Sequence, residues 1–149
     1  MTGLLKSKHS SPRESVGFLF WKVSSHWQRE IREALKNLEL THAQFVLLAS
    51  LVWLSEHHDV VTQQLLSKQS SIDKMVVSDV VRLLESKRYI QRLEHPTDSR
   101  AVRLVPTSLG IRTAQKAIQL VEAVDGKFFE LTDQEASDFK KTLLELIGE

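Results

Sequence analysis

The sequence contains no cysteine, only five glycines and three prolines, and no long hydrophobic run. Without cysteine the chain forms no disulfide, offers no thiolate ligand to zinc or to an iron–sulfur cluster, and has no cysteine redox sensor. The longest apolar stretch, 45–54, is ten residues long and contains Ser50, so it is too short to span a bilayer. The segment 1–11 lacks the apolar centre of a secretory signal. We therefore expect a soluble, cytoplasmic protein with no membrane association and no cofactor.

The composition is that of a single globular domain. The chain has 149 residues, of which 42% are apolar and 26% charged, and a chain of this length can bury a core of its own. The net charge is only +1, but residues 60–112 carry nine Lys or Arg against five Asp or Glu, while residues 113–149 carry four against eight. A basic middle and an acidic tail suit a nucleic-acid-binding segment on a neutral scaffold. Two solvated faces of different charge explain the same counts equally well.

Two helices are predicted in the first third of the chain. The segment 11–14 offers an N-cap serine, a proline at the first helical position and a glutamate at the third, which is typical of a helix start. Apolar residues then recur three or four positions apart as far as Leu38, which predicts one long amphipathic helix. Thr41 and Gln44 form a capping box that opens a second helix, ending near Glu56. That helix is apolar nearly all round, so we expect it at the centre of the domain.

The middle of the chain predicts a winged helix-turn-helix. Thr62 caps a short helix over 63–68, and a further helix spans about 73–87. Two short strands then follow, at 89–94 and 101–105, with a polar turn between them. A short helix, a tight polar turn, a second helix and a two-stranded hairpin are the elements of a winged helix-turn-helix, in that order.

Long helices flank this unit and predict a homodimer. Thr107 begins a helix that ends near Phe129, and a capping box formed by Thr132 and Glu135 opens the last helix. So small a unit covers the apolar stripes of these helices poorly, and a second copy related by a two-fold axis would bury them. We therefore predict a mainly α fold with a small β-hairpin wing, in which a winged helix-turn-helix lobe is flanked by long terminal helices that form a homodimer interface. The predicted boundaries are about 41–106 for the DNA-binding lobe, and about 12–38 and 107–149 for the dimerisation helices.

The hairpin carries a resemblance to a known family. Asp98-Ser99-Arg100-Ala101, Leu104, Thr107 and Gly110 are similar to the wing signature of the MarR family of bacterial transcriptional regulators. The segment 72–87 resembles the recognition helix of that family, and the resemblance extends over about residues 12–147. It implies a triangular homodimer on palindromic operator DNA that usually represses transcription and often responds to small aromatic or phenolic ligands.

Two positions depart from the family pattern. Asp79 stands in the predicted recognition helix where members of the family often have arginine, and a carboxylate facing phosphate is unfavourable. Pro106 stands where many members have leucine, which the end of a strand tolerates.

Arg100 is the strongest candidate for a DNA contact. A guanidinium at the tip of a wing can enter the minor groove, where negative potential is focused, and Asp98 would direct it through a bidentate pair. The alternative is a surface ion pair of little consequence. The other predicted DNA contacts lie on the recognition helix and the wing strands, namely Lys74, Met75, Val77, Ser78, Arg82, Arg92 and Arg103. Core packing is the alternative for Met75 and Val77 and is the stronger one for Val77, while Arg92 and Arg103 also suit a solvated strand face.

An effector cavity is the least specific of the predicted sites. Phe18, Trp21, His26 and Trp53 would line it between the first, second and fifth helices, although each also suits core or dimer packing. The six histidines include no His-x3-His pair and no matched ligand set, so no metal site is predicted. Neither a glycine-rich phosphate loop nor a nucleophile elbow is present, which argues against an enzyme.

These patterns together predict a ligand-responsive repressor that binds operator DNA in a sequence-specific manner. The alternative from another class is a winged-helix protein-interaction module without specific DNA binding, which the acidic Asp79 favours.

Overall fold

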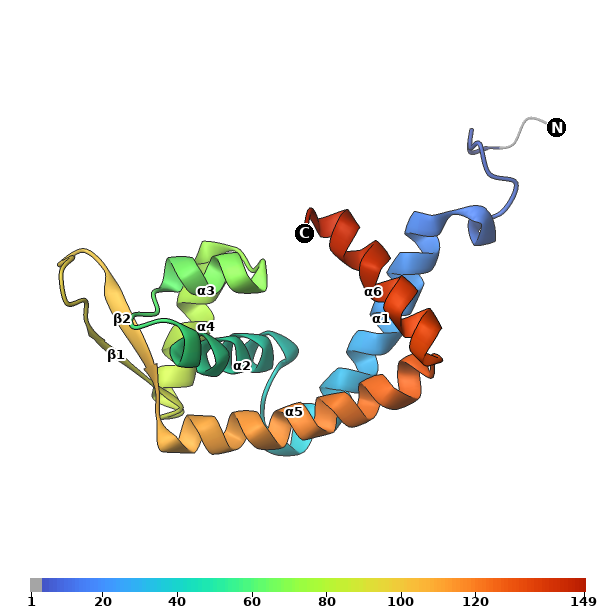
Figure 1. Cartoon of the computed structure of the whole chain (residues 1–149). Helices are drawn as coiled ribbons and strands as arrows, with labels where there is room; N and C mark the ends of the chain where they lie inside the picture. Colours follow the sequence, from blue (N-terminus) through green and yellow to red (C-terminus); the bar gives the residue numbers. More distant parts are fainter. Residues whose placement is uncertain (1–3) are drawn as a thin grey trace.

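The structure, a computed structural model, describes residues 4–149 and contains six α-helices and one antiparallel hairpin among them (Figure 1). The predicted order of elements is confirmed, and the boundaries shift by a few residues. Short 3₁₀ turns are labelled η. The elements are η1 (Pro12–Glu14), α1 (Val16–Leu35), η2 (Lys36–Leu38), α2 (His42–His57), α3 (Gln63–Ser70), α4 (Lys74–Ser86), β1 (Ile90–Glu94), β2 (Val102–Pro106), α5 (Ser108–Phe129) and α6 (Asp133–Ile147).

The first helix differs from the single long helix expected from the sequence. Pro12–Glu14 forms only a 3₁₀ turn, because Ser15 is extended and its hydroxyl accepts a 3.2 Å hydrogen bond from the Phe18 amide, which starts α1 at Val16. The Glu14 carboxylate accepts hydrogen bonds from the amide and hydroxyl of Ser10, at 2.9 and 2.6 Å. Ser15 thus competes with Ser11, the N-cap expected from the sequence, and moves the start of the α-helix along the chain.

The predicted start signals of the later helices are confirmed. Thr41 and Gln44 form the capping box of α2, and Thr132 and Glu135 form that of α6. The Thr62 hydroxyl caps α3 by accepting a 3.2 Å hydrogen bond from the Leu65 amide. These caps satisfy amides that would otherwise lack a partner in the first turn of each helix.

Helix α2 lies at the centre of the core, as its apolar pattern predicts. Its residues Leu47, Leu48, Leu51 and Leu54 are almost completely shielded from solvent. They pack in one cluster with the buried residues of α1, α4 and α5. Burial of an aliphatic side chain stabilises a fold by about 1.5–3 kcal/mol, so this cluster holds α2, α3, α4 and the hairpin together. We call these four elements the lobe.

The base of the hairpin is fixed by Thr107. Its hydroxyl donates a 2.7 Å hydrogen bond to the Arg88 carbonyl and accepts one of 3.0 Å from the Gly110 amide. Gly110 packs directly on the Tyr89 carbonyl, and a Cβ at this position would overlap it. Arg88 is left-handed (φ 63°), so β1 begins at Ile90 and not at Tyr89. Pro106 pairs opposite Ile90 at the end of β2, where a missing amide proton is tolerated.

Helix α5 leads from the base of the hairpin to the other end of the molecule, where α1 and α6 lie (Figure 1). We call α1, α5 and α6 the arm. Of the α6 residues, all of which the structure describes, none is buried. The amino-terminal half of α1 is equally uncovered, with Trp21 69% exposed. The arm therefore presents apolar surface that this chain alone does not bury.

Length and composition determine whether a helix could cross a membrane. Within residues 4–149 no single helix is long and apolar enough to cross a bilayer. The bent pair Val16–Leu38 and His42–His57, with 75° between its parts, meets both requirements together, and its second part is the core helix α2.

Candidate nucleic-acid interface

Helix α4 exposes a polar face away from the core. The Asp73 carboxylate caps the helix by accepting a 2.9 Å hydrogen bond from the Met75 amide. Met75 is 79% exposed, and it lies on the same side of the helix as Asp79 and Arg82, four and seven residues further on, which are also exposed. Lys74 is exposed in the first turn. The accessible face of α4 therefore combines two cations, one carboxylate and a thioether.

Val77 is an exception among the predicted DNA contacts. It is 0% exposed and belongs to the core cluster with Val81 and Leu84. A side chain without solvent exposure cannot reach a thymine methyl group, so the expectation of a base contact by Val77 is wrong. The core-packing alternative is correct, because position 77 lies on the α4 stripe that packs on the rest of the lobe.

Three parts of the chain meet at a polar hollow of about 650 Å³ beside α4. The amino-terminal turn of α3 contributes Thr62, Gln63 and Gln64, and α4 contributes Ser78. The wing contributes the two arginines Arg92 and Arg100, together with His95 and Asp98. Amides at a helix amino terminus and arginine side chains both favour anions. The hollow thus brings together four of the residues predicted from the sequence to contact DNA, namely Ser78, Arg92, Asp98 and Arg100.

Asp98 and Arg100 interact differently from the expected bidentate pair. The Asp98 carboxylate accepts a 2.9 Å hydrogen bond from the backbone amide of Arg100, and the Asp98 carbonyl accepts one of 3.2 Å from the Ala101 amide. An aspartate side chain that binds the amide two residues ahead forms a local turn. In this structure Asp98 therefore fixes the main chain at Arg100.

Arg103 is tied into the sheet more closely than expected. It pairs with Leu93 in the hairpin and also forms an isolated bridge to Thr62, just before α3. The adjacent Leu104 amide donates a 2.8 Å hydrogen bond to the Val61 carbonyl. Arg103 is half-buried, whereas Arg92 on the opposite strand is exposed. Of these two arginines, Arg92 lines the polar hollow.

His95 and the amino-terminal turn of α3 were not among the residues predicted to contact DNA. Both line the hollow. The signal for α3 was present in Thr62, whose cap orients the amides of the first turn. His95 carried no such signal, because its role depends on hydrogen bonds across the turn of the hairpin.

Comparison with known proteins supports the same interpretation. The model of the MarR family matches residues 40–102. The HTH-type transcriptional regulator YdcH of Bacillus subtilis is 43% identical over 123 residues, which cover 83% of this chain and 84% of that protein. The chain belongs to the MarR family. It is accordingly a DNA-binding transcriptional regulator with a winged helix-turn-helix.

Solved structures of the MarR family share the whole architecture. A mutant of MarR from Escherichia coli in complex with operator DNA superposes with a TM-score of 0.78 at 27% identity, covering 88% of this chain and 92% of that one. BpsR of Bordetella bronchiseptica, whose DNA binding is regulated by 6-hydroxynicotinic acid, superposes with a TM-score of 0.84 at 21% identity, covering 97% and 99%. At that identity the second likeness concerns the fold alone.

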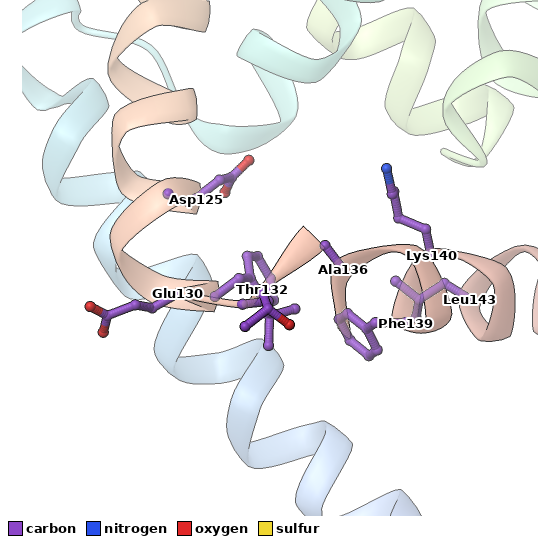
Figure 2. A pocket seen from close by; sticks show the side chains of 10 residues that line it. Asp125, Glu130, Thr132, Ala136, Phe139, Lys140 and Leu143 are labelled. Carbon is purple, nitrogen blue, oxygen red and sulfur yellow. The ribbon is translucent and has the colours of Figure 1, made fainter. Parts of the chain in front are cut away.

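The four residues predicted to line an effector cavity line neither the polar hollow beside α4 nor the hollow between the end of α5 and α6 in this MarR-family chain. Phe18, Trp21 and His26 are exposed on α1. Trp53 is exposed on α2, where its ring stacks on His57 with 4.2 Å between the centroids. A hollow of about 720 Å³ lies instead between the end of α5 and α6, and Asp125, Phe129, Phe139 and Lys140 help to line it (Figure 2).

Titratable groups with shifted pKa values lie at the joints between helices. Burial lowers the pKa of His42, the nearby positive charge of Arg32 lowers it further, and Asp125 partly opposes this. Hydrogen bonds from Thr132 lower the pKa of Glu135, as expected of a capping carboxylate. Among the described residues no group of three or more His, Cys, Asp or Glu is arranged to hold a metal ion.

Proposed function

We propose that this MarR-family regulator binds palindromic operator DNA as a homodimer and represses transcription. The observation that carries the proposal is the polar hollow, which is lined by the start of α3, by Ser78 of α4 and by the wing arginines Arg92 and Arg100. In this arrangement α4 enters the major groove and the wing follows the adjacent minor groove. The face of α4 that carries Met75 and Arg82 then meets the base edges.

Each DNA contact has a distinct proposed role. Lys74 and Arg92 neutralise backbone phosphates, which positions the lobe without reading sequence. Arg82 and Ser78 reach base edges, where arginine favours guanine. Asp79, on the same face, accepts hydrogen bonds from the exocyclic amine of cytosine and repels phosphate. Arg100, in the turn of the wing, reads the narrow minor groove, and the half-buried Arg103 supports the strand that follows this turn.

The arm is the proposed dimer interface. Exposed apolar side chains lie near the amino terminus of α1 and near the carboxyl terminus of α6. They include Val16, Phe20 and Trp21 on α1 and Leu144, Leu146 and Ile147 on α6. An apolar hollow of about 430 Å³ lies between Val23 of α1 and Phe139 of α6. Apolar surface of this extent marks an association site, and a second copy related by a two-fold axis would cover it on both chains.

The proposed repressor responds to a small aromatic effector. Phe18, Trp21, His26 and Trp53 are proposed to face it between the arm and the lobe once the second copy closes that side. A ligand changes DNA affinity only when it binds one arrangement of the two recognition helices better than another. BpsR, which shares this fold, is regulated by 6-hydroxynicotinic acid, so aromatic acids are the first class to screen.

Selection of bound duplexes from a random pool tests the proposal directly. A dimeric regulator enriches a palindrome whose half-sites lie about one helical turn apart. Failure to enrich any sequence, or enrichment of a single half-site, would contradict a dimer on operator DNA.

Deletion of residues 133–149 tests the interface. Because α6 contributes no buried residue among those described, the core survives. Sedimentation is expected to show a monomer, and circular dichroism is expected to show that this monomer is folded. An intact dimer in this truncation would show that α6 is not required for the interface.

A further inference from the structure

His95, in the turn of the wing, holds the main chain ahead of it. Its Nδ1 accepts hydrogen bonds from the backbone amides of Thr97, at 3.1 Å, and of Asp98, at 3.0 Å. The Thr97 hydroxyl lies 3.5 Å from the same atom. A backbone amide only donates, so Nδ1 carries a lone pair and the proton of the neutral ring is on Nε2. The arrangement therefore requires the uncharged imidazole in one tautomer.

The turn continues from His95 to Arg100 through one further side chain. His95 anchors the amide of Asp98, and the Asp98 carboxylate in turn accepts the 2.9 Å hydrogen bond from the Arg100 amide. Each of these bonds restrains the backbone two or three residues ahead. The position of Arg100 thus depends on an acceptor five residues earlier in the chain.

The charged residues around His95 all come from the hairpin. Arg92, Asp98 and Arg100 share the polar hollow with it, and Glu94 lies on its other side. The two helices that border the hollow contribute neutral residues only, which are Thr62 with Gln63 and Gln64 at the start of α3, and Ser78 of α4. The charged residues that share a hollow with the ring are therefore two cations and two carboxylates, all of them from the hairpin itself.

We infer that His95 is a positioning residue for Arg100 and that specific DNA binding by this protein requires its neutral imidazole. The inference rests on the proposed role of the wing in the minor groove. Protonation places a hydrogen on Nδ1, which can then no longer accept from Thr97 and Asp98. The turn loses both restraints, and Arg100 leaves its position.

Mild acid consequently has opposite effects on two kinds of binding. A protonated, positively charged ring beside DNA strengthens contacts that do not depend on sequence. Loss of the turn weakens the contacts that do depend on the DNA sequence. The preference for operator over unrelated DNA therefore falls as the pH is lowered, while binding to unrelated DNA does not weaken.

Two substitutions at position 95 separate the acceptor from the ring. His95→Asn places an amide oxygen close to the position of Nδ1, since asparagine readily accepts from amides two and three residues ahead, and it does not titrate. His95→Ala removes the acceptor altogether. His9→Asn, which removes a histidine of the amino-terminal segment far from the wing in sequence, is the matched control.

The experiment measures anisotropy with the duplex that the parent chain enriches and with a scrambled duplex of the same composition, at pH 8.0 and 5.5. At pH 8.0, His95→Ala is expected to lose about fivefold to tenfold in operator preference, the effect of one or two hydrogen bonds, and His95→Asn is expected to retain it. At pH 5.5 the parent and His9→Asn lose a similar factor, whereas His95→Asn changes least. Amide resonances of Thr97 and Asp98, followed by NMR in the full chain without DNA, are expected to shift between pH 8.0 and 5.5 in the parent.

Three results would overturn the inference. If His95→Asn binds as poorly as His95→Ala at pH 8.0, the ring itself makes the contact and the acceptor does not matter. If the operator preference of His95→Asn falls with pH as steeply as that of the parent, another group titrates. Unshifted Thr97 and Asp98 resonances would show that the turn does not respond. Absence of specific binding by the parent would refute the proposed function as well, whereas parental binding weakened by Arg100→Ala and unaffected by His95→Ala would refute the role of His95 alone.

Discussion

The indole Nε1 of Trp27 donates a 2.8 Å hydrogen bond to the Asp125 carboxylate, which joins α1 to α5 across 98 residues of sequence. His42, at the start of α2, packs edge-on against the same indole with 5.1 Å between the ring centroids. The contact therefore links two helices of the arm to the first turn of the lobe. Because Trp27, Asp125 and His42 join the arm to the lobe, a change in the angle between arm and lobe would alter the contacts between these three side chains.

Removal of this hydrogen bond is expected to destabilise the fold. Trp27→Phe keeps an aromatic ring but leaves the half-buried Asp125 carboxylate without its indole donor, and a hydrogen bond to a charged group contributes about 1.5–3 kcal/mol. Urea unfolding followed by circular dichroism measures the change. The matched control is Trp53→Phe, because Trp53 is exposed, and it is expected to cost less than about 1 kcal/mol. Equal losses for the two variants would show that the Trp27–Asp125 bond adds nothing.

Stability is expected to fall in mild acid because of His42. Burial and Arg32 lower its pKa in the folded chain below the ordinary value of 6.5, so as the pH falls below about 7 the unfolded chain takes up the proton first. The free energy of unfolding then decreases with falling pH. His42→Gln removes this group, and its unfolding free energy is expected to decline less than that of the parent between pH 7.5 and 5. Parallel declines, measured by urea unfolding at several pH values, would exclude this contribution.

The wing is expected to depend on the Asp98 acceptor and not on its charge. Arg100→Ala weakens operator binding, more so where the flanks of the operator are rich in A·T pairs, because these narrow the minor groove. Asp98→Asn retains an oxygen for the Arg100 amide and is expected to bind nearly as well as the parent, whereas Asp98→Ala loses about fivefold.

Lys74→Ala provides the contrast for this series. It is expected to weaken binding to all duplexes alike and to lower the salt slope by about one unit, as the loss of a phosphate contact does. Anisotropy titrations across salt measure all four variants, with circular dichroism as the control for folding. If Asp98→Asn binds as poorly as Asp98→Ala, the negative charge of Asp98 matters, and an ion pair with the Arg100 guanidinium explains its role.

Gly110 is expected to tolerate no side chain. A Cβ there would overlap the Tyr89 carbonyl at the base of the wing, so Gly110→Ala forces the hairpin away from α5 and costs about 1–3 kcal/mol, as overpacking of a core does. A Cβ on Gly126, in the same helix, would meet no neighbouring atom within 4 Å, and Gly126→Ala is expected to be neutral or to stabilise by up to about 1 kcal/mol. Thermal unfolding of the two variants compares them directly, and a stable Gly110→Ala variant would contradict the close packing.

Peroxide is expected to weaken DNA binding through Met75. The thioether is exposed on the accessible face of α4, and oxidation to the sulfoxide makes it polar and chiral. Met75→Leu keeps an apolar side chain of similar size and removes the reactive sulfur, so its binding is expected to withstand the same treatment. Peptide mapping by mass spectrometry confirms the oxidised position. The chain contains no thiol that could be oxidised instead. Equal sensitivity of the parent and Met75→Leu would show that oxidation of another residue causes the effect.

Local signals account for most of what the sequence predicts correctly. The capping boxes at Thr41 and Thr132 and the N-cap at Thr107 lie within three residues of the amides they bind, so their effect is independent of the rest of the fold. The apolar pattern of α2 likewise predicts its central position. Where two local signals compete, as Ser11 and Ser15 do at the first helix, spacing alone does not determine which one starts it.

Caps, periodicity and turn residues act over a few residues, and they were therefore enough to predict the order of the elements, the winged helix-turn-helix and the position of the wing. The packed fold, in contrast, sets three features that no local signal contains: Val77 faces the core, Asp98 binds a main-chain amide, and His95 holds the turn. It also decided that Trp27 meets Asp125. These facts depend on which side of an element faces its neighbours and on contacts between segments far apart in the chain, and a sequence pattern does not contain either.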